Sequence, residues 1–437
     1  MKKQLRIAIT LLGLASFAQA QSFDLNLANK LQRQLDSIRA ANNIKGISAC
    51  VIYPGVGTWK GVTGISHAGT RITSDMEFGI ASNTKLFTGV LLLKLAENKI
   101  IHLDDSLHEY LPVFNNIDPN ITIRQLLNHT SGLYDVTSVP GYPDSMLRNP
   151  NRIFTARELM TWARPPLFPA GTGWDYCNTN YLLAGMIAES ATGQSYGQLL
   201  RDSILTPLRL DSTFLDVYDN ILYPVAHPWQ GGTDNFATPR KSINSAAWAA
   251  GAMYSTSGEM AQWYHALMNG KVINANSFKE MTTFVGSGNY GIGISRAIVN
   301  GRRLWQHGGT IWGGYNSFML YDTQTGIVIC VLINQLPGQA MQVATQLLST
   351  LVNNPVSATE DNMGVAPFMV YPNPTSDVVN IDMPAQTLQG VKVFNATGQL
   401  LKETVETQFS VSNFPDGLYF ITVHTQKGTY LCKLIKR

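Results

Sequence analysis

Ser82 and Lys85 form the pair of residues with the clearest potential for chemistry in this sequence. They stand at the entry to NTKLFTGVLLLKLAEN, a run of strong helix formers that Ser82 or Asn83 is placed to cap. A spacing of three residues puts both side chains on one helical face. The residues that share this face with Lys85 further along the helix are apolar. Burial lowers the pKa of a lysine, so the neutral amine can take the proton of a serine hydroxyl. The pair therefore predicts a serine nucleophile, although S-x-x-K alone also fits a surface lysine.

The N-terminus of the same helix would add positive potential and free N–H groups where an oxyanion forms. Of all the serines in the chain, only Ser82 is followed three positions later by lysine. This places the expected reaction at the start of the helix.

A second serine motif, Gly193-Gln194-Ser195-Tyr196-Gly197, fits the GxSxG pattern of hydrolases by its letters. The nucleophile elbow of that pattern needs a strand before the serine and a helix after it. Here the preceding segment NYLLAGMIAESATG has helical composition and ends in a glycine typical of a helix C-terminus. We therefore predict that Ser195 lies in a turn between helices, outside the active site.

Four segments occur in this order along the chain: FGIASNTK (Phe78 to Lys85), LLNHTSGL (Leu126 to Leu133), PAGTGWDYCNTNYLLAG (Pro169 to Gly185) and QHGGT (Gln306 to Thr310). Together they resemble the penicillin-recognising serine hydrolases related to class C β-lactamases, D-Ala-D-Ala carboxypeptidases and certain esterases. The resemblance spans roughly residues 25–350. It implies acyl transfer through an acyl-Ser82 intermediate that water then attacks, with no cofactor.

The resemblance assigns roles to two of the motifs. Its S-x-x-K falls on Ser82, the nucleophile, and Lys85, and its Tyr-x-Asn falls on Tyr176 and Asn178. Tyr176 and Lys85 together would accept the Ser82 proton and later pass one to the leaving group. Which of the two is the base stays open, because they would titrate as a coupled pair. Asn178 would orient Lys85 and a substrate amide.

The third motif of the family falls on His307-Gly308-Gly309. The two glycines would let an edge strand approach the substrate, and the N–H groups of Ser82 and Thr310 would form the oxyanion hole, typically worth ~3–4 kcal/mol per donor. His307 replaces the lysine of true class C β-lactamases, and histidine is only partly charged at neutral pH. This argues against an efficient β-lactamase. Any preference for a substrate with a carboxylate must then come from His307 and the N–H groups of the oxyanion hole.

The function predicted first is a secreted serine hydrolase acting on D-Ala-containing peptides or related amides. An esterase or a D-amino acid amidase on the same machinery is the alternative among enzymes. The alternative from another class is a weakly catalytic protein that binds peptidoglycan or a β-lactam. Intact Ser82, Lys85 and Tyr176 argue against that last hypothesis, because a pure binder does not need all three.

Other conspicuous residues near the motifs receive structural interpretations. We expect Cys177, in the middle of Tyr-x-Asn, to be a small packed side chain facing away from the cleft. His129 is expected to be a structural histidine with its hydrogen bonds satisfied. Trp174, Trp305 and Trp312 flank two of the motifs and fit either cleft lining or core packing.

The elements that must position these residues are strands at both ends of residues 21–353 and helices between them. An amphipathic helix is expected at LANKLQRQLDSIRAAN, strands at ISACVIY and WKGVTGISH, and further strands at RRLWQHGG, YNSFMLYD and GIVICVLIN. The helix QVATQLLSTLV ends the region. This order predicts an α/β (α+β) domain of the β-lactamase/transpeptidase-like kind, with an antiparallel sheet flanked by helices plus an all-helical region.

Residues 1–20 have the pattern of a secretory signal peptide. Lys2, Lys3 and Arg6 precede the apolar run Ile7 to Ala15, and Ala18-Gln19-Ala20 is a small-residue cleavage site. The apolar run is too short to span ~30 Å of hydrocarbon, and no later stretch reaches ~18 apolar residues. The mature protein is therefore expected to lack a transmembrane segment.

The C-terminal end changes character. Residues 354–367 form a polar linker with Pro and Gly, and residues 368–437 hold short alternating strands separated by turns, which predicts a small all-β sandwich. Composition alone also fits a carbohydrate-binding or adhesion module. However, YPNPTSDVVNID and GLYFITVHTQKGTYLCKLIKR resemble the C-terminal sorting domain of type IX secretion cargo. This implies export through the periplasm to the cell surface or medium, with the secretion machinery as a partner and usually with removal of the domain.

Composition excludes several other functions. The 437 residues are 45% hydrophobic and only 14% charged, which excludes disorder as the main state. Lys2, Lys3 and Arg6 account for the whole net charge of +3, so the mature chain is neutral. No dense Lys/Arg run suggests a nucleic-acid partner. HExxH and CxxC motifs, which would predict a metal site, do not occur.

The four cysteines are too few for a disulfide scaffold. Cys50 and Cys330 each lie in a strand-like apolar run, so a disulfide between them is possible outside the cytoplasm. Burial of both as small hydrophobic side chains is the expected state.

Overall fold

The computed structural model describes residues 23–221, 223–237, 240–311, 313–354, 370–383, 388–395, 399–425 and 428–437. The expected signal peptide (1–20), most of the expected linker (354–367) and Trp312 lie outside the described residues. The chain divides into two compact units, Met1–Pro355 and Val356–Arg437, and each is described by itself.

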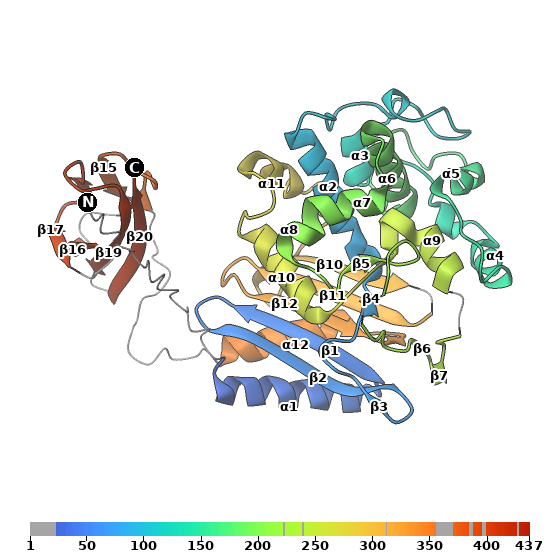
Figure 1. The fold of residues 1–437 in the computed structure, drawn as a ribbon, viewed down its shortest axis with the longest axis horizontal. Coiled ribbons are helices and arrows are strands. Elements are labelled where there is room, and N and C mark those ends of the chain that lie inside the picture. Colours follow the sequence, from blue (N-terminus) through green and yellow to red (C-terminus); the bar gives the residue numbers. More distant parts are fainter. Residues whose placement is uncertain are drawn as a thin grey trace, which may run out of the picture. The chain divides into compact units, whose positions relative to one another are not determined.

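Seven strands of the first unit form one antiparallel sheet in the order β3-β2-β1-β12-β11-β10-β9 (Figure 1). They are β1 (Gly46–Tyr53), β2 (Gly57–His67), β3 (Thr70–Arg71), β9 (Ser295–Val299), β10 (Arg302–Ile311), β11 (Tyr315–Asp322) and β12 (Val328–Ile333). Strands from the two ends of the unit meet where β1 pairs with β12, with Cys50 opposite Cys330. Both cysteines are buried free thiols, as expected. The predicted antiparallel sheet is confirmed.

Helices cover both faces of this sheet. The helices α1 (Leu25–Ala41) and α12 (Ala340–Asn353) pack on each other and on one face, and α10 (Ser257–Met268) packs on the other, as Figure 1 shows. The helix α1 buries Leu27, Leu31, Leu35 and Ile38 at helical spacing, as its amphipathic pattern predicted. The sheet thus lies between two helical layers.

An all-helical region lies beyond α10, with α2 (Thr84–Glu97) at its centre. This helix is apolar on all sides and almost wholly buried, because α6, α7, α9 and α11 surround it. The other helices of the unit are α3 (Ile123–Leu127), α4 (Tyr142–Arg148), α5 (Ala156–Leu159), α6 (Asn178–Thr192), α7 (Tyr196–Leu200), α8 (Thr206–Leu208), α9 (Arg240–Gly251) and α11 (Ala275–Met281). The predicted helical region is therefore confirmed.

Two small sheets tie the helical region to the main sheet. One contains β4 (Phe78–Gly79), β8 (Met253–Ser255) and β5 (Phe214–Leu215), and the other contains β13 (Gln335–Leu336), β6 (Trp229–Gln230) and β7 (Thr233–Asp234). The strand β4 leads directly into the turn that carries Ser82.

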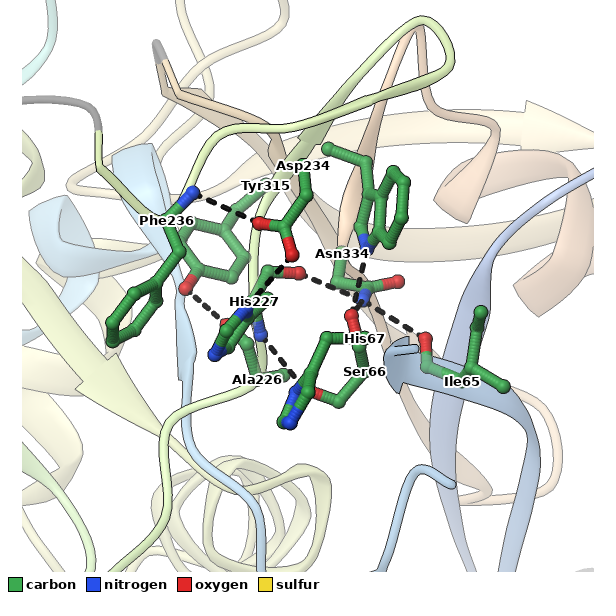
Figure 2. A network of polar contacts seen from close by, with 10 residues as sticks. Ile65, Ser66, His67, Ala226, His227, Asp234, Phe236, Tyr315 and Asn334 are labelled. Carbon is green, nitrogen blue, oxygen red and sulfur yellow. Dashed lines mark hydrogen bonds and ion pairs between the residues drawn. The ribbon is translucent and has the colours of Figure 1, made fainter. Parts of the chain in front are cut away.

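A polar network fastens the β6–β7 hairpin to the end of β2 (Figure 2). The Asn334 Nδ2 donates to the carbonyl oxygens of Ile65 and His227, at 3.2 and 2.8 Å. His227 Nδ1 lies 2.9 Å from Asp234 Oδ2, and its ring stacks on His67 with centroids 3.9 Å apart. Gly314, in the turn after β10, packs so closely on the Trp229 backbone that a Cβ there would lie 2.4 Å from it. The network therefore also fixes the turn that follows β10.

The second unit contains two small antiparallel sheets with their own core. Strands β14 (Val370–Tyr371), β15 (Val378–Ile381) and β18 (Gln408–Ser410) form one, and β17 (Leu400–Thr404), β16 (Leu388–Asn395), β19 (Gly417–Thr425) and β20 (Gly428–Lys436) form the other. Buried residues from both sheets, among them Val379, Val393, Phe409 and Ile421, form one apolar cluster. The predicted all-β C-terminal region is confirmed.

Candidate active site

Ser82 lies in the short 3-10 turn η1 (Ala81–Asn83), which runs directly into α2. The expectation that Ser82 or Asn83 caps this helix is wrong. Asn83 has helical φ and ψ angles and makes no capping hydrogen bond. Instead its Nδ2 donates to Ser317 Oγ at 2.7 Å, and Ser317 Oγ donates to the Ile80 carbonyl at 2.7 Å. The turn that presents Ser82 is therefore fastened to β11.

Ala81, directly before Ser82, has a φ of +50°. A left-handed conformation costs a non-glycine residue about 1 kcal/mol or more. Such a strained backbone conformation persists only where surrounding contacts hold it in place. Here the hydrogen bonds from Asn83 to Ser317 and from Ser317 to the Ile80 carbonyl hold the turn.

Lys85 is fully buried one turn after Ser82. Its Nζ donates to Asn178 Oδ1 at 2.7 Å, to the Ala250 carbonyl at 2.8 Å and to Ser82 Oγ at 3.1 Å. Desolvation lowers the pKa of Lys85 from 10.5 to about 7, with the negative charge of Asp135 opposing the fall. A substantial fraction of the amine is therefore neutral near pH 7, as the sequence predicted for a buried lysine.

Tyr176 lies beside this pair, with its ring centroid 4.9 Å from Lys85 Nζ. Burial raises the pKa of Tyr176 above its usual 10.0, and interaction with Ser82 opposes that rise. The buried Tyr176 hydroxyl forms no hydrogen bond of standard geometry with any described residue, although Ser82 lies close enough to affect its pKa. The phenol is protonated at neutral pH and free to bond to an atom that enters the site.

Asn178 is the first residue of α6, and it joins Lys85 to a loop that the sequence analysis missed. Its Nδ2 donates to Asp135 Oδ2 at 2.9 Å and to Thr137 Oγ1 at 3.1 Å. Asp135 and Thr137 lie just after the LLNHTSGL segment. The carboxylate of Asp135, two residues beyond that motif, is the sequence feature that could have predicted this loop as part of the site.

The strand β10 brings His307, Gly308, Gly309 and Thr310 past the Ser82 turn. On one side these residues pair with β11, whereas β9 pairs only with residues 302–306. A Cβ on Gly309 would lie 2.3 Å from the Ile80 carbonyl oxygen, so only glycine allows this approach. Residues 307–311 therefore present an edge without a β9 partner beside Ser82.

His307 does not have the partial charge expected of it. Its ring is nearly buried, Nδ1 donates to the Gly308 carbonyl at 2.7 Å, and Nε2 accepts from the Tyr290 hydroxyl at 2.8 Å. Desolvation, reinforced by Lys85, lowers the pKa of His307 to about 3. The ring is neutral at pH 7 with both nitrogens engaged, so it supplies no positive charge for a carboxylate. Tyr290, in the segment NYGIGIS (residues 289–295), is a partner of His307 that the sequence analysis missed.

Two hollows meet at Ser82, and Asn178 and Thr310 border both of them. A cavity of about 220 Å³ has largely apolar walls, which include Tyr142, Leu182, Ile243, Ala246, Ala247 and Ile311. A wider hollow of about 740 Å³ extends along β10 toward the start of α12. Among the described residues that line them, no arginine or lysine occurs. The site therefore fits an uncharged group on its apolar side.

The structural interpretations of Ser195 and Cys177 hold. Ser195 caps α7 after α6 ends at Gly193, so no strand precedes it and GxSxG is not a nucleophile elbow. His129 is buried and its Nδ1 accepts from the Cys177 backbone N–H at 3.2 Å, but its Nε2 has no hydrogen-bond partner among the described residues, so the expectation of a fully satisfied histidine is wrong. Cys177 is fully buried in the core.

The described tryptophans near the motifs pack away from the two hollows. Trp174 donates from Nε1 to the Asn128 carbonyl at 3.0 Å, and Trp305 packs against Phe278 and Phe284. Within the described residues, no group of three or more His, Cys, Asp or Glu side chains is arranged to hold a metal ion.

Residues 31–351 match the family described as Beta-lactamase. The chain belongs to the Beta-lactamase family. Within this family the protein is a serine hydrolase, related to penicillin-binding proteins and amidases. Residues 369–437 match the Secretion system C-terminal sorting domain, so the protein is exported by type IX secretion to the cell surface or beyond. No helix in the described part of the chain is long and apolar enough to cross a membrane.

Several relatives support the Beta-lactamase assignment. "Protein flp" of Staphylococcus aureus is 27% identical over 357 residues, which cover 77% of this chain and 70% of the relative. The crystal structure of a D-stereospecific amidohydrolase from Streptomyces sp. is 29% identical, with a TM-score of 0.65 over 73% of this chain and 97% of that one. A D-amino acid amidase from Ochrobactrum anthropi SV3 is 27% identical, with a TM-score of 0.67 over 75% and 99%.

Proposed function

We propose that the protein hydrolyses amide bonds of small D-amino acid derivatives through an acyl-Ser82 intermediate. The observation that carries this proposal is the buried Lys85 amine, 3.1 Å from Ser82 Oγ, with its pKa lowered to about 7 by desolvation. A desolvated lysine beside a serine hydroxyl is an arrangement that activates the serine as a nucleophile at neutral pH.

In the proposed reaction, Lys85 takes the proton of Ser82 while Ser82 Oγ forms a bond to the substrate carbonyl carbon. The N–H groups of Ser82 and Thr310 stabilise the oxyanion. The protonated Tyr176 hydroxyl, which makes no hydrogen bond of standard geometry to the described residues, gives its proton to the departing nitrogen and regains one from Lys85. Water then attacks the carbonyl carbon of the acyl-enzyme. The same proton transfers run in the opposite direction, which releases the acid and returns the proton to Ser82.

The electrostatics of the site favour a substrate without a terminal carboxylate. A neutral His307 and hollows without a described arginine or lysine offer such a carboxylate no counter-charge. This supports the amidase hypothesis over D-Ala-D-Ala carboxypeptidase or β-lactamase activity. The similarity to a D-amino acid amidase and a D-stereospecific amidohydrolase supports the stereochemistry. An esterase uses the same groups and is the second candidate, because an ester is uncharged too.

Covalent labelling tests the nucleophile. A fluorophosphonate probe should label the wild-type protein at a single site, and Ser82→Ala should abolish labelling. Ser195→Ala, which removes only the cap of α7, is the matched control and should be labelled like the wild type. Labelling that persists in Ser82→Ala, or that moves to Ser195, would contradict the proposal.

A substrate panel tests the specificity. We expect kcat/KM to be highest for an amide such as D-phenylalanine amide and lower for its L-enantiomer, a D-Ala-D-Ala peptide and a cephalosporin. A short p-nitrophenyl ester in the same panel separates amidase from esterase activity. Faster turnover of the carboxylate-bearing substrates would show that the electrostatic argument is wrong.

A further inference from the structure

The loop between α3 and α4, which contains Asp135 and Thr137, holds the Asn178 side chain from the side opposite Lys85. Asn178 Nδ2 donates one hydrogen to Asp135 Oδ2 at 2.9 Å and the other to Thr137 Oγ1 at 3.1 Å. The Asn178 backbone N–H donates to the same Asp135 oxygen at 3.1 Å. Both amide hydrogens of the side chain are thereby used.

The Asp135 carboxylate is saturated by donors. Its Oδ1 accepts from the Thr137 backbone N–H at 2.9 Å and from the Thr137 hydroxyl at 2.8 Å, and its Oδ2 accepts the two bonds from Asn178. An ionised carboxylate can only accept hydrogen bonds. Rotating the Asn178 amide by half a turn would place its oxygen against this carboxylate and leave both partners unsatisfied, so one orientation is enforced.

The enforced orientation determines which atom faces Lys85. Asn178 Oδ1 and the Ala250 carbonyl lie 2.7 and 2.8 Å from Lys85 Nζ, and neither oxygen can donate. When the ammonium loses a proton, its two remaining hydrogens stay on these oxygens. The lone pair is then left for Ser82 Oγ, 3.1 Å away. A rotated amide would instead direct its NH2 group at the lone pair.

We propose that Asp135 is a positioning residue of this active site, which fixes the Asn178 amide so that the lone pair of the neutral Lys85 amine faces Ser82. The proposal rests on the acyl-Ser82 function proposed above. Asp135 lines neither of the two hollows at Ser82, so its effect is exerted through Asn178 and through its charge. That charge partly offsets the lowering of the Lys85 pKa by burial.

The other titratable groups around Lys85 are neutral near pH 7. Burial raises the pKa values of Tyr176 and Tyr181 above 10, and raises that of Cys177 to about 12. Burial lowers the pKa of His129 well below 6.5 and that of His307 to about 3. Desolvation is thus the main cause of the lowered Lys85 pKa, and Asp135 is the charged group among the described neighbours that opposes it.

The test is the pH profile of Asp135→Asn, which keeps the side-chain shape but removes the charge and the acceptor-only character. We expect kcat to fall on the order of 10-fold to 100-fold with a smaller change in KM, as for a misplaced catalytic group. The acid limb of kcat/KM should move to lower pH by ~1 unit, because the Lys85 ammonium loses a stabilising negative charge. Thr137→Val keeps the charge but removes one acceptor of the amide, so kcat should fall less and the acid limb should stay in place.

Asp144→Asn, an exposed carboxylate on α4, is the matched control and should behave like the wild type. An unshifted acid limb or an unchanged kcat in Asp135→Asn would overturn the proposal. If Asp135→Asn does not fold, Asp135→Glu and Thr137→Val replace it in the test. Both variants must then lower kcat while the acid limb of kcat/KM stays at the wild-type pH. A wild-type kcat in Thr137→Val overturns the proposal. Wild-type protein that is not labelled at Ser82 would instead refute the proposed function itself.

Discussion

Lys85 is completely buried and donates hydrogen bonds to three acceptors. Desolvation favours the neutral amine, whereas the three acceptors and Asp135 favour the ammonium. The balance places the pKa of Lys85 near neutrality, where a general base is most effective.

The pH dependence of acylation should follow this titration. Because Lys85 acts as a base only when deprotonated and its pKa is about 7, kcat/KM should rise with pH and level off above about pH 8. The pre-steady-state rate of fluorophosphonate labelling, measured from pH 5 to 9, checks this. An acid limb near pH 4, or none, would mean that another group accepts the Ser82 proton.

Glu77 is a buried carboxyl group outside the mechanism. It is fully buried just before β4, and neither of its carboxyl oxygens has a hydrogen-bond partner among the described residues. Desolvation, reinforced by Glu259 and Asp216, raises the pKa of Glu77 from 4.5 to about 8. The group is therefore mostly protonated at pH 7.

This raised pKa predicts a pH-dependent stability. The native state holds the Glu77 proton more tightly than the unfolded chain, so its contribution is fully present below about pH 4.5 and is lost as pH rises through about 8. In Glu77→Gln this loss should disappear, with a gain over wild type on the order of a few kcal/mol at pH 9. Urea unfolding at pH 5, 7 and 9 measures the effect. Parallel pH profiles for both proteins would show that Glu77 is already ionised in the folded state.

At the scale of elements, the approach of β10 to the Ser82 turn decides the shape of the site. Gly309 lies against the Ile80 carbonyl, and Ser317 on the neighbouring strand β11 bonds to the same oxygen. The oxyanion-hole geometry that we propose depends on this contact, because it sets the distance between Ser82 and Thr310.

Gly309→Ala should therefore separate the strand from the turn. A Cβ at this position would lie 2.3 Å from a backbone oxygen, which cannot move as a flexible side chain would. We expect kcat/KM to fall on the order of 100-fold. Gly232→Ala, where a Cβ meets nothing within 4 Å, is the control for a glycine substitution on the surface. Activity within a few-fold of wild type in Gly309→Ala would mean that β10 does not have to approach so closely.

At the scale of the whole molecule, every candidate site residue lies in the first of two compact units. The sorting domain has its own apolar core, built from its own two sheets. The candidate catalytic residues and the sorting domain therefore lie in separate parts of the chain.

This separation predicts that the exported enzyme works without its C-terminal domain. We expect the released protein to lack the region from about Tyr371 onward, and a chain of residues 23–354 to be labelled at Ser82 at the wild-type rate. Intact mass spectrometry of the secreted protein and labelling of the truncated chain check both parts. A secreted mass equal to residues 21–437 would contradict the removal, and an unfolded truncated chain would contradict the independence of the first unit.

Two features could be predicted from residue types and spacing alone: the order of helices and strands that gives the fold class, and the Ser82–Lys85 pair, because helical spacing places Lys85 beside Ser82. The tyrosine motif, the strand motif at His307 and the C-terminal sorting domain were predicted instead from the resemblance of short segments to known families. The absence of a strand before Ser195 was encoded locally too, so GxSxG could be rejected from sequence.

Only the tertiary structure decided how these groups are charged and oriented. The role of Asp135, the neutrality of His307 and the partner of Asn83 depend on residues far apart in the chain, such as Asp135 with Asn178 and His307 with Tyr290. Protonation states follow from burial and from the groups that surround a side chain, and neither is written in the spacing of a motif. For this reason the sequence predicted a partly charged His307, whereas burial lowers the pKa of His307 to about 3 and leaves the ring neutral.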